Sequence, residues 1–199
     1  MTRIGTRIFK LKCVAFSLLL LAVLSGCATL GDKISGVEKG VFLDGPVGGL
    51  TYKTPTLEGV TKADGMFRYK SGEAVTFSVG GLVLGSTQGK KVITPLDLFA
   101  DAKDASDQRV VNVCVFLQSL DQDGNPENGI VITKEVADVV AKLGAQTDFN
   151  KHVRRFSFDP AFRSVMAELN EKDAFAAPRA VRPPGAAQKH LEATLSGLK

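Results

Sequence analysis

The stretch GVTKADGMFRYKSGEAVTFSVGG (residues 59–81) decides the fold of this chain. Its Asp64-Gly65 pair is typical of a tight hairpin, and residues 71–73 (SGE) predict a second turn one strand later. After that turn apolar and polar residues alternate, which places one set of side chains on a single face of a strand: Val75, Phe77 and Val79. The stretch therefore predicts strands of an antiparallel sheet joined by tight turns.

Similar short segments extend on both sides of this stretch. About five to seven short strands separated by Gly-rich turns predict a small antiparallel β-sandwich or open barrel. After Leu96 the glycines become fewer and the apolar residues follow the helical period, so we expect about three to four helices. The expected fold class is α+β, with a β-rich module at residues 41–95 and a helical domain at residues 96–199.

The helical half contains residues that are typical of helix starts, because a short oxygen-bearing side chain precedes each apolar stripe. These candidate caps are Ser106 or Asp107, Thr133, and Asp159 followed by Pro160. Residues 176–186 (AAPRAVRPPGA) are rich in proline and are expected to form a linker. A last short helix is expected to carry Leu191, Leu195 and Leu198.

The positive charge of the chain is concentrated at its start. The 199 residues carry a formal net charge of +4, and no Asp or Glu precedes Asp32. Removal of residues 1–26 leaves a chain close to neutral, because it removes four basic residues: Arg3, Arg7, Lys10 and Lys12. The high isoelectric point is thus no indication of a basic face for nucleic acid, and we expect no nucleic-acid partner.

An apolar run at residues 14–24 follows these basic residues and ends in Leu24-Ser25-Gly26-Cys27. The run is too short to span a bilayer comfortably and is typical of a signal-peptide core. Its end resembles the lipobox of bacterial lipoproteins, which implies cleavage before Cys27, acylation of that cysteine, and a membrane as partner through the lipid anchor. Residues 1–26 are then a lipoprotein signal peptide, and residues 27–40 the acylated cysteine and a tether. The alternative is an ordinary secreted protein in which Cys27 is incidental.

The lipobox resemblance also implies a location. In Gram-negative lipoproteins of this kind, an Asp after the acylated cysteine favours the inner membrane, and this chain has Ala28 there. We therefore expect a lipid-anchored protein of the bacterial envelope, in the outer membrane rather than the inner one.

A second resemblance concerns residues 41–85. Residues 59–69 (GVTKADGMFRY) followed by residues 72–77 (GEAVTF) are similar to the prealbumin-like, carboxypeptidase-regulatory-type β-sandwich modules of bacterial surface proteins. Together with residues 94–98 and 117–130, the chain resembles uncharacterised bacterial surface lipoproteins. The resemblance implies a binding or structural role outside the cytoplasm and supplies no catalytic residues.

The most informative polar segment is DQDGNPENGI (residues 121–130). Oxygen-bearing side chains alternate in it, and such side chains can converge on a calcium ion: Asp121, Asp123 and Asn125, with Glu127 or Asn128 completing the shell. The alternative is a turn in which Asx side chains accept hydrogen bonds from local backbone amides. Both interpretations stay open, and calcium is the one candidate cofactor.

No motif for catalysis is recognisable in the sequence. His152 and His190 have no Cys or His at metal-ligand spacing, and the Gly85-Ser86 pair lacks the second glycine of a nucleophile elbow. Cys114 lies in an apolar segment, where a small buried side chain is expected in preference to a reactive thiol.

These observations favour a protein that is not an enzyme. The first hypothesis is a binding or adhesion module for an envelope protein or polymer. The second is a structural or assembly lipoprotein stabilised by calcium. The third is an envelope hydrolase, which requires His152 or His190 to meet a Ser and an Asp in three dimensions. A basic cluster at residues 151–155 (KHVRR) is either a solvated charge run or a contact for an anionic headgroup or polymer.

Overall fold

The structure is a computed structural model that describes residues 36–198. The predicted signal peptide, Cys27 and most of the predicted tether lie outside the described residues. The strands are β1 (Val37–Phe42), β2 (Val47–Gly48), β3 (Thr51–Lys53), β4 (Glu58–Val60), β5 (Met66–Lys70), β6 (Ala74–Val79), β7 (Leu82–Gln88), β8 (Val92–Ile93) and β9 (Ile130–Val131). The helices are η1 (Pro95–Leu98), α2 (Gln108–Ser119), η2 (Pro126–Asn128), α3 (Lys134–Leu143), α4 (Val153–Phe156), α5 (Pro160–Glu171) and α6 (Pro184–Ser196).

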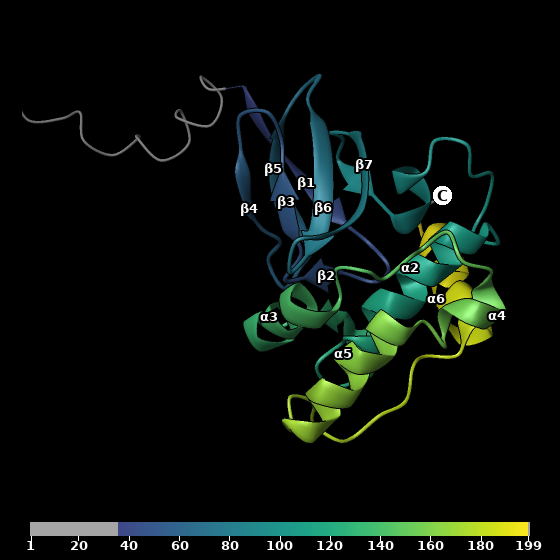
Figure 1. Cartoon of the computed structure of the whole chain (residues 1–199). Helices are drawn as coiled ribbons and strands as arrows, with labels where there is room; N and C mark the ends of the chain where they lie inside the picture. The colour runs from purple at the N-terminus through teal and green to yellow at the C-terminus, as the bar shows by residue number, and fades with distance from the viewer. Residues whose placement is uncertain (1–35, 199) are drawn as a thin grey trace, which may run out of the picture.

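The predicted α+β class is confirmed. Strands gather on one side of the molecule and helices on the other (Figure 1). One sheet has the order β4-β3-β6-β7 and is antiparallel throughout, a second has the order β5-β1-β8, and β2 pairs with β9. Over residues 36–198 these sheets do not close into a barrel.

The expectation of purely antiparallel pairing is corrected at two places. Strand β1 pairs with β8 in parallel, and β2 pairs in parallel with β9. Both partners arrive after long excursions of the chain, and a long crossover connection is what parallel pairing requires. Strand β9 is moreover contributed by the half of the chain that was predicted to be helical.

The sheets enclose an aromatic core. The alternating residues of β6 are buried as predicted, and Phe77 contacts Phe42 and Phe67 at ring-centroid distances of 4.7 and 5.1 Å. Tyr52 of β3 lies 5.9 Å from the same Phe67 ring. Each ring buries a large apolar area, so these contacts fix the two sheets against each other.

The predicted tether is shorter than expected at its C-terminal end. Residues 37–40 belong to β1, and Val37 and Glu38 pair with Lys70 and Tyr69 of β5. The Tyr69 hydroxyl donates to the Glu38 carboxylate at 3.0 Å. The segment is polar and small, but its backbone pairs with β5 as part of the central strand of a sheet, and composition alone does not reveal that pairing.

The helix caps follow the sequence closely. Asp107, Thr133 and Asp159 each accept a hydrogen bond from a backbone amide in the first turn of α2, α3 and α5. The predicted linker 176–186 ends earlier than expected, because α6 already begins at Pro184. Proline is tolerated in a first helical turn, where its missing amide hydrogen has no intrahelical partner.

The two predicted domains share one core. A single cluster of buried apolar residues includes side chains of the β half (residues 37–93) and of the helical half (residues 94–198). The β2–β9 pair and the contact of the β6–β7 turn with α3 join the halves. The predicted boundary at residues 95 and 96 thus marks a change of secondary structure and not a break in packing.

The β6–β7 turn provides a test of this junction. Gly80 and Gly81 both have positive φ angles, of 55° and 85°. A Cβ at Gly80 would overlap the carbonyl oxygen of Ala137 in α3, whereas a Cβ at Gly81 would meet open space. We expect Gly80→Ala to lower the free energy of unfolding by about 3 kcal/mol and Gly81→Ala by about 1 kcal/mol, measured by urea denaturation. Equal effects would mean that the turn does not pack on α3.

Candidate functional site

A buried polar cluster lies at the junction of the two halves. Asp44 follows β1, Gln118 lies in α2 and His190 in α6, and their side chains are almost fully buried. One carboxylate oxygen of Asp44 lies 3.0 Å from His190 Nδ1, and the other accepts a hydrogen bond from Gln118 Nε2 at 2.9 Å. The second ring nitrogen of His190 lies 3.0 Å from the carbonyl oxygen of Pro126.

This geometry defines the protonation state of His190. Both of its ring nitrogens face oxygen acceptors, a carboxylate and a backbone carbonyl, so both must donate. The ring is therefore an imidazolium paired with the Asp44 carboxylate. The hydrogen bond with Asp44 accordingly raises the pKa of His190, and this effect outweighs the opposing effect of burial.

Cys114 lies beside this cluster, within interaction distance of the Asp44 carboxylate. Its thiol is fully buried, as the sequence predicted, and burial raises its pKa well above the ordinary value. Asp44 interacts with both Cys114 and His190, and the two nitrogens of His190 are bonded to Asp44 and Pro126. The arrangement therefore differs from a nucleophile–base pair, in which a histidine nitrogen faces the thiol.

The sequence analysis did not identify this cluster. Asp44 and His190 are 146 residues apart, and neither occurs in a recognisable motif. One clue was available, because His190 lies among the buried residues of α6, next to Leu191 and one turn after Ala187. A polar residue inside a buried stripe requires a partner, although the sequence does not say which one.

The 121–130 loop has the hydrogen bonds of the Asx-turn alternative. Asp121 is buried, and its Oδ1 accepts from the Val131 amide at 2.8 Å. Asp123 accepts from the Asn125 amide and from the Asn128 side chain, both at 2.8 Å. Burial raises the pKa of Asp121, whereas the hydrogen bond from Asn128 lowers that of Asp123. Glu127 is exposed and acts electrostatically on His190.

A guanidinium group covers this loop. Arg179 donates to the carbonyl oxygens of Asp121 and Gln122, the latter at 2.7 Å, and its guanidinium lies 4.0 Å from the centre of the Phe175 ring. A Cβ at Gly124 would lie only 2.7 Å from Arg179 Nη1, so the loop and the arginine are in close contact. The Arg179 guanidinium thus supplies the positive charge next to the carboxylates of the 121–130 loop.

Within residues 36–198, no three or more His, Cys, Asp or Glu side chains gather in a way that could hold a metal ion. Oδ2 of Asp121 is buried and has no hydrogen-bond partner in that same part of the chain. Calcium binding by Asp121, Asp123, Asn125 and Glu127 therefore stays a prediction. It requires several of these side chains to exchange their present hydrogen bonds for the ion.

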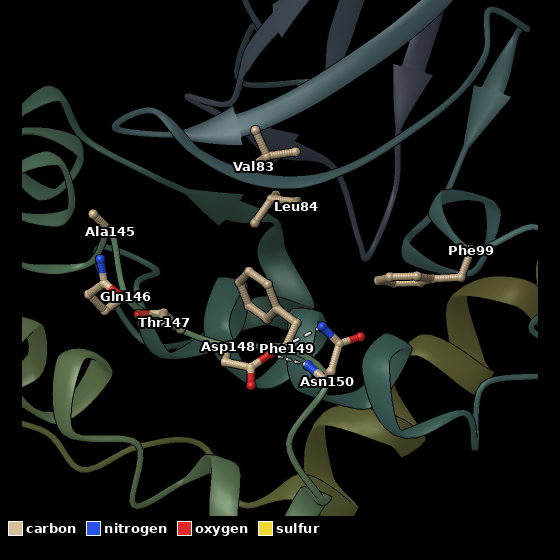
Figure 2. A pocket seen from close by; sticks show the side chains of 9 residues that line it. All are labelled: Val83, Leu84, Phe99, Ala145, Gln146, Thr147, Asp148, Phe149 and Asn150. Atoms are coloured by element: carbon tan, nitrogen blue, oxygen red, sulfur yellow. Dashed lines mark hydrogen bonds between the residues drawn. The ribbon is translucent and has the colours of Figure 1, made fainter.

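Two shallow hollows open on the surface. The first, of about 390 Å³, lies between β7 and the loop 145–150. Figure 2 shows the Phe149 ring directed toward Leu84 of β7, with Phe99 on the other side. The Asp148 carboxylate at its rim accepts from both the backbone and the side chain of Asn150, at 2.9 and 3.1 Å. The hydrogen bonds of the Asp148 carboxylate therefore stabilise the loop to which it belongs.

The second hollow, of about 430 Å³, surrounds α4 and is called the α4 hollow below. Its lining consists of Lys151, His152, Arg154, Arg155, Phe158, Asp159 and Pro160. The Lys151 ammonium pairs with the buried Asp159 carboxylate, and His152 Nδ1 accepts from the Arg154 amide at 3.3 Å. Arg154 and Arg155 are exposed and have no ion-pair partner within residues 36–198. The Phe158 ring is 73% exposed.

The α4 hollow rests on a rigid base. The buried Asn112 of α2 donates to the carbonyl oxygens of Phe149 and Lys151, at 2.9 and 2.7 Å. Phe156, two residues before Phe158, is fully buried and packs on Phe149 and Phe162. These contacts hold the segment in place, so the exposure of its charged and aromatic side chains does not result from loose packing.

Comparison of the chain with protein-family models, with curated proteins and with solved structures found no match. A search of the described helices for one long and apolar enough to cross a membrane also found none.

The pair of Asp44 and His190 predicts a pH dependence of stability. The folded-state pKa of His190 is raised above 6.5, so its stabilising contribution is complete below pH 6.5 and is lost as the pH rises through the folded-state value. In urea denaturation between pH 6 and pH 9, we expect the free energy of unfolding to fall by about 1.4 kcal/mol per pH unit inside that window. His190→Gln should reduce this slope and cost about 3 kcal/mol at pH 6, because it leaves Asp44 without its counter-charge. Equal slopes in the two proteins would contradict the imidazolium.

The contacts of Arg179 with the 121–130 loop lead to a prediction for the stability of the protein. We expect Arg179→Ala to lower the free energy of unfolding by about 3 kcal/mol, because two carbonyl oxygens lose their donor, with Arg179→Lys intermediate. The Asx-turn alternative predicts the same thermal midpoint for the unaltered protein in millimolar calcium and in chelator. A rise with calcium that the double variant Asp121→Ala, Asp123→Ala abolishes would instead establish the ion site.

Proposed function

We propose that this chain is a lipid-anchored, non-catalytic binding module of the bacterial envelope, and that it binds an anionic partner in the α4 hollow. The observation that carries the proposal is the group of Arg154, Arg155 and Phe158. Two guanidinium groups without an ion-pair partner in residues 36–198 lie next to the one phenylalanine ring that the described chain exposes strongly.

These three side chains contribute little to the fold. Neither guanidinium gains an ion pair within the described residues, and a phenylalanine ring in water forgoes about 1.5–3 kcal/mol of burial free energy. Lys151 in the same hollow differs, because its ammonium pairs with Asp159, the cap of α5. An anion bound by the two arginines would supply their counter-charge, and its apolar part would cover the ring.

The anchoring part of the proposal is supported by the sequence. Basic residues, an apolar run and the Leu24-Ser25-Gly26-Cys27 box follow one another in the order that lipoprotein export requires. Ala28 favours the outer membrane. The strands of the β half, packed on shared aromatic rings, are compatible with the resemblance to prealbumin-like surface modules.

One fractionation experiment tests both parts. In bacteria fed labelled palmitate, we expect the full-length chain to take up label, to sediment with membranes, and to stay with the insoluble envelope material after detergent extraction. Cys27→Ser should abolish labelling. The double variant Arg154→Gln, Arg155→Gln should keep the label and membrane association, but its detergent-insoluble fraction should fall about tenfold, because its contacts to the anionic partner are lost.

Lys53→Gln combined with Lys142→Gln is the matched control, because it removes two exposed charges that do not line the hollow. It should behave like the unaltered protein. Labelling that persists in Cys27→Ser would disprove the anchor, and equal retention of both double variants would disprove the binding face.

A further inference from the structure

We propose that the ligand of the α4 hollow is an anionic glycan, whose carboxylate or phosphate groups pair with Arg154 and Arg155 while a sugar ring packs on Phe158. This inference rests on the proposed function and names the ligand class of the same site. It is carried by three features: the position of the hollow relative to the tether, the chemistry of its cations, and the isolation of its aromatic ring.

Helix α4, which contributes Arg154 and Arg155 to the hollow, lies on the opposite side of the domain from the start of β1 (Figure 1). In Figure 1 the chain enters β1 at the upper left, whereas α4 lies at the far right, beyond α2 and α6. A globular chain of this size is about 40 Å across. The segment from Cys27 to Gly36 reaches at most about 30 Å when fully extended. A tether of that length is too short to bring the hollow to the anchoring membrane.

The available donors suit an oxyanion. Arginine presents a planar fork of N–H groups that pairs with a carboxylate or a phosphate through two parallel hydrogen bonds. Arg154 and Arg155 are free to do so, and Nε2 of His152 has no bond to a residue in the described chain, since only Nδ1 is used. Lys151 is held by Asp159 and shapes the wall of the hollow. The site thus offers two guanidinium forks and no acceptor that is free for a cation.

The aromatic ring distinguishes a glycan from an acidic protein. A protein interface of ordinary size buries about 800 Å² on each partner and has an apolar centre. Phe158 has no such surroundings, because Pro160 is the one other apolar residue among those that line the hollow. One ring in a hollow of about 430 Å³ fits the C–H face of a single sugar, with charged groups beside it.

The test uses the full-length lipidated protein, inserted in nanodiscs of neutral phosphatidylcholine, with three polymers as probes. Polygalacturonate carries carboxylates on sugar rings, polyglutamate carries carboxylates without rings, and dextran carries rings without charge. By isothermal titration calorimetry we expect polygalacturonate to bind about tenfold more tightly than polyglutamate, and dextran not to bind.

The variants separate charge from stacking. Phe158→Ala should weaken polygalacturonate binding to the level of polyglutamate and leave polyglutamate unchanged, whereas Phe158→Tyr should keep the preference. Arg154→Gln with Arg155→Gln should abolish binding of both anionic polymers. Lys53→Gln with Lys142→Gln should leave all affinities within about twofold, since these charges lie outside the hollow.

Three results would overturn the inference. Equal binding of polyglutamate and polygalacturonate would indicate an acidic protein as partner. Protection of residues 151–160 from hydrogen exchange in phosphatidylglycerol discs, without any polymer, would indicate that the hollow contacts the membrane. Retention on envelope material that depends on the arginines, without binding of polygalacturonate, would reject the glycan and leave the proposed function standing. Retention that is unchanged in the arginine double variant would reject the proposed function itself.

Discussion

The buried ion pair of Asp44 and His190 is the contact on which the arrangement of the two halves depends. Removal of two charges from water costs several kcal/mol per ion, and such a pair is favourable only when further hydrogen bonds complete its surroundings. Here the side chain of Gln118 and the carbonyl of Pro126 supply them. Because these four residues come from the β half, α2, η2 and α6, the cluster is complete only when all of these elements are docked. The pair thus holds the last helix against the first strand.

The 121–131 segment extends this junction. Pro126 bonds to His190, and the Ile130 and Ile132 amides donate to the carbonyl oxygens of Pro46, just before β2, and of Gly48, at its end. Asp121 in turn holds the Val131 amide, and Arg179 holds the Asp121 carbonyl. The alternating oxygen-bearing side chains that suggested an ion site therefore also fix a connector whose backbone serves both halves. A segment of this kind needs many local hydrogen bonds, because it contains little regular structure to satisfy its backbone.

Features that depend on residues close together in the sequence could be predicted, whereas features that depend on residues far apart in the sequence could not. The turn at Asp64-Gly65, the burial of Phe77 and the cap at Asp159 depend on neighbours within a few residues, and the structure has all three. The predicted hairpin is wrong, because the strands on either side of that turn, β4 and β5, pair in different sheets. The parallel pairs, the pairing of residues 37–40 with β5, and the partner of His190 depend on residues far along the chain. A single sequence contains no information on which distant segments meet. The α4 hollow lies between these cases, since the cluster KHVRR was visible but the exposure of Phe158 beside the buried Phe156 was not.

The cations of the domain divide into those that support the fold and those that do not. Lys151, Arg109 and Arg179 each hold a carboxylate or a carbonyl of their own chain. Arg154 and Arg155 hold none in the described chain, yet the base beneath them contains the fully buried Phe156, packed on Phe149 and Phe162. Because the chain without its first 26 residues is nearly neutral, their attraction is local and extends about 8–10 Å at physiological salt. Under the proposed function, the ligand must then be selected by direct contact in the α4 hollow. The contacts available there are an exposed aromatic ring and two guanidinium groups.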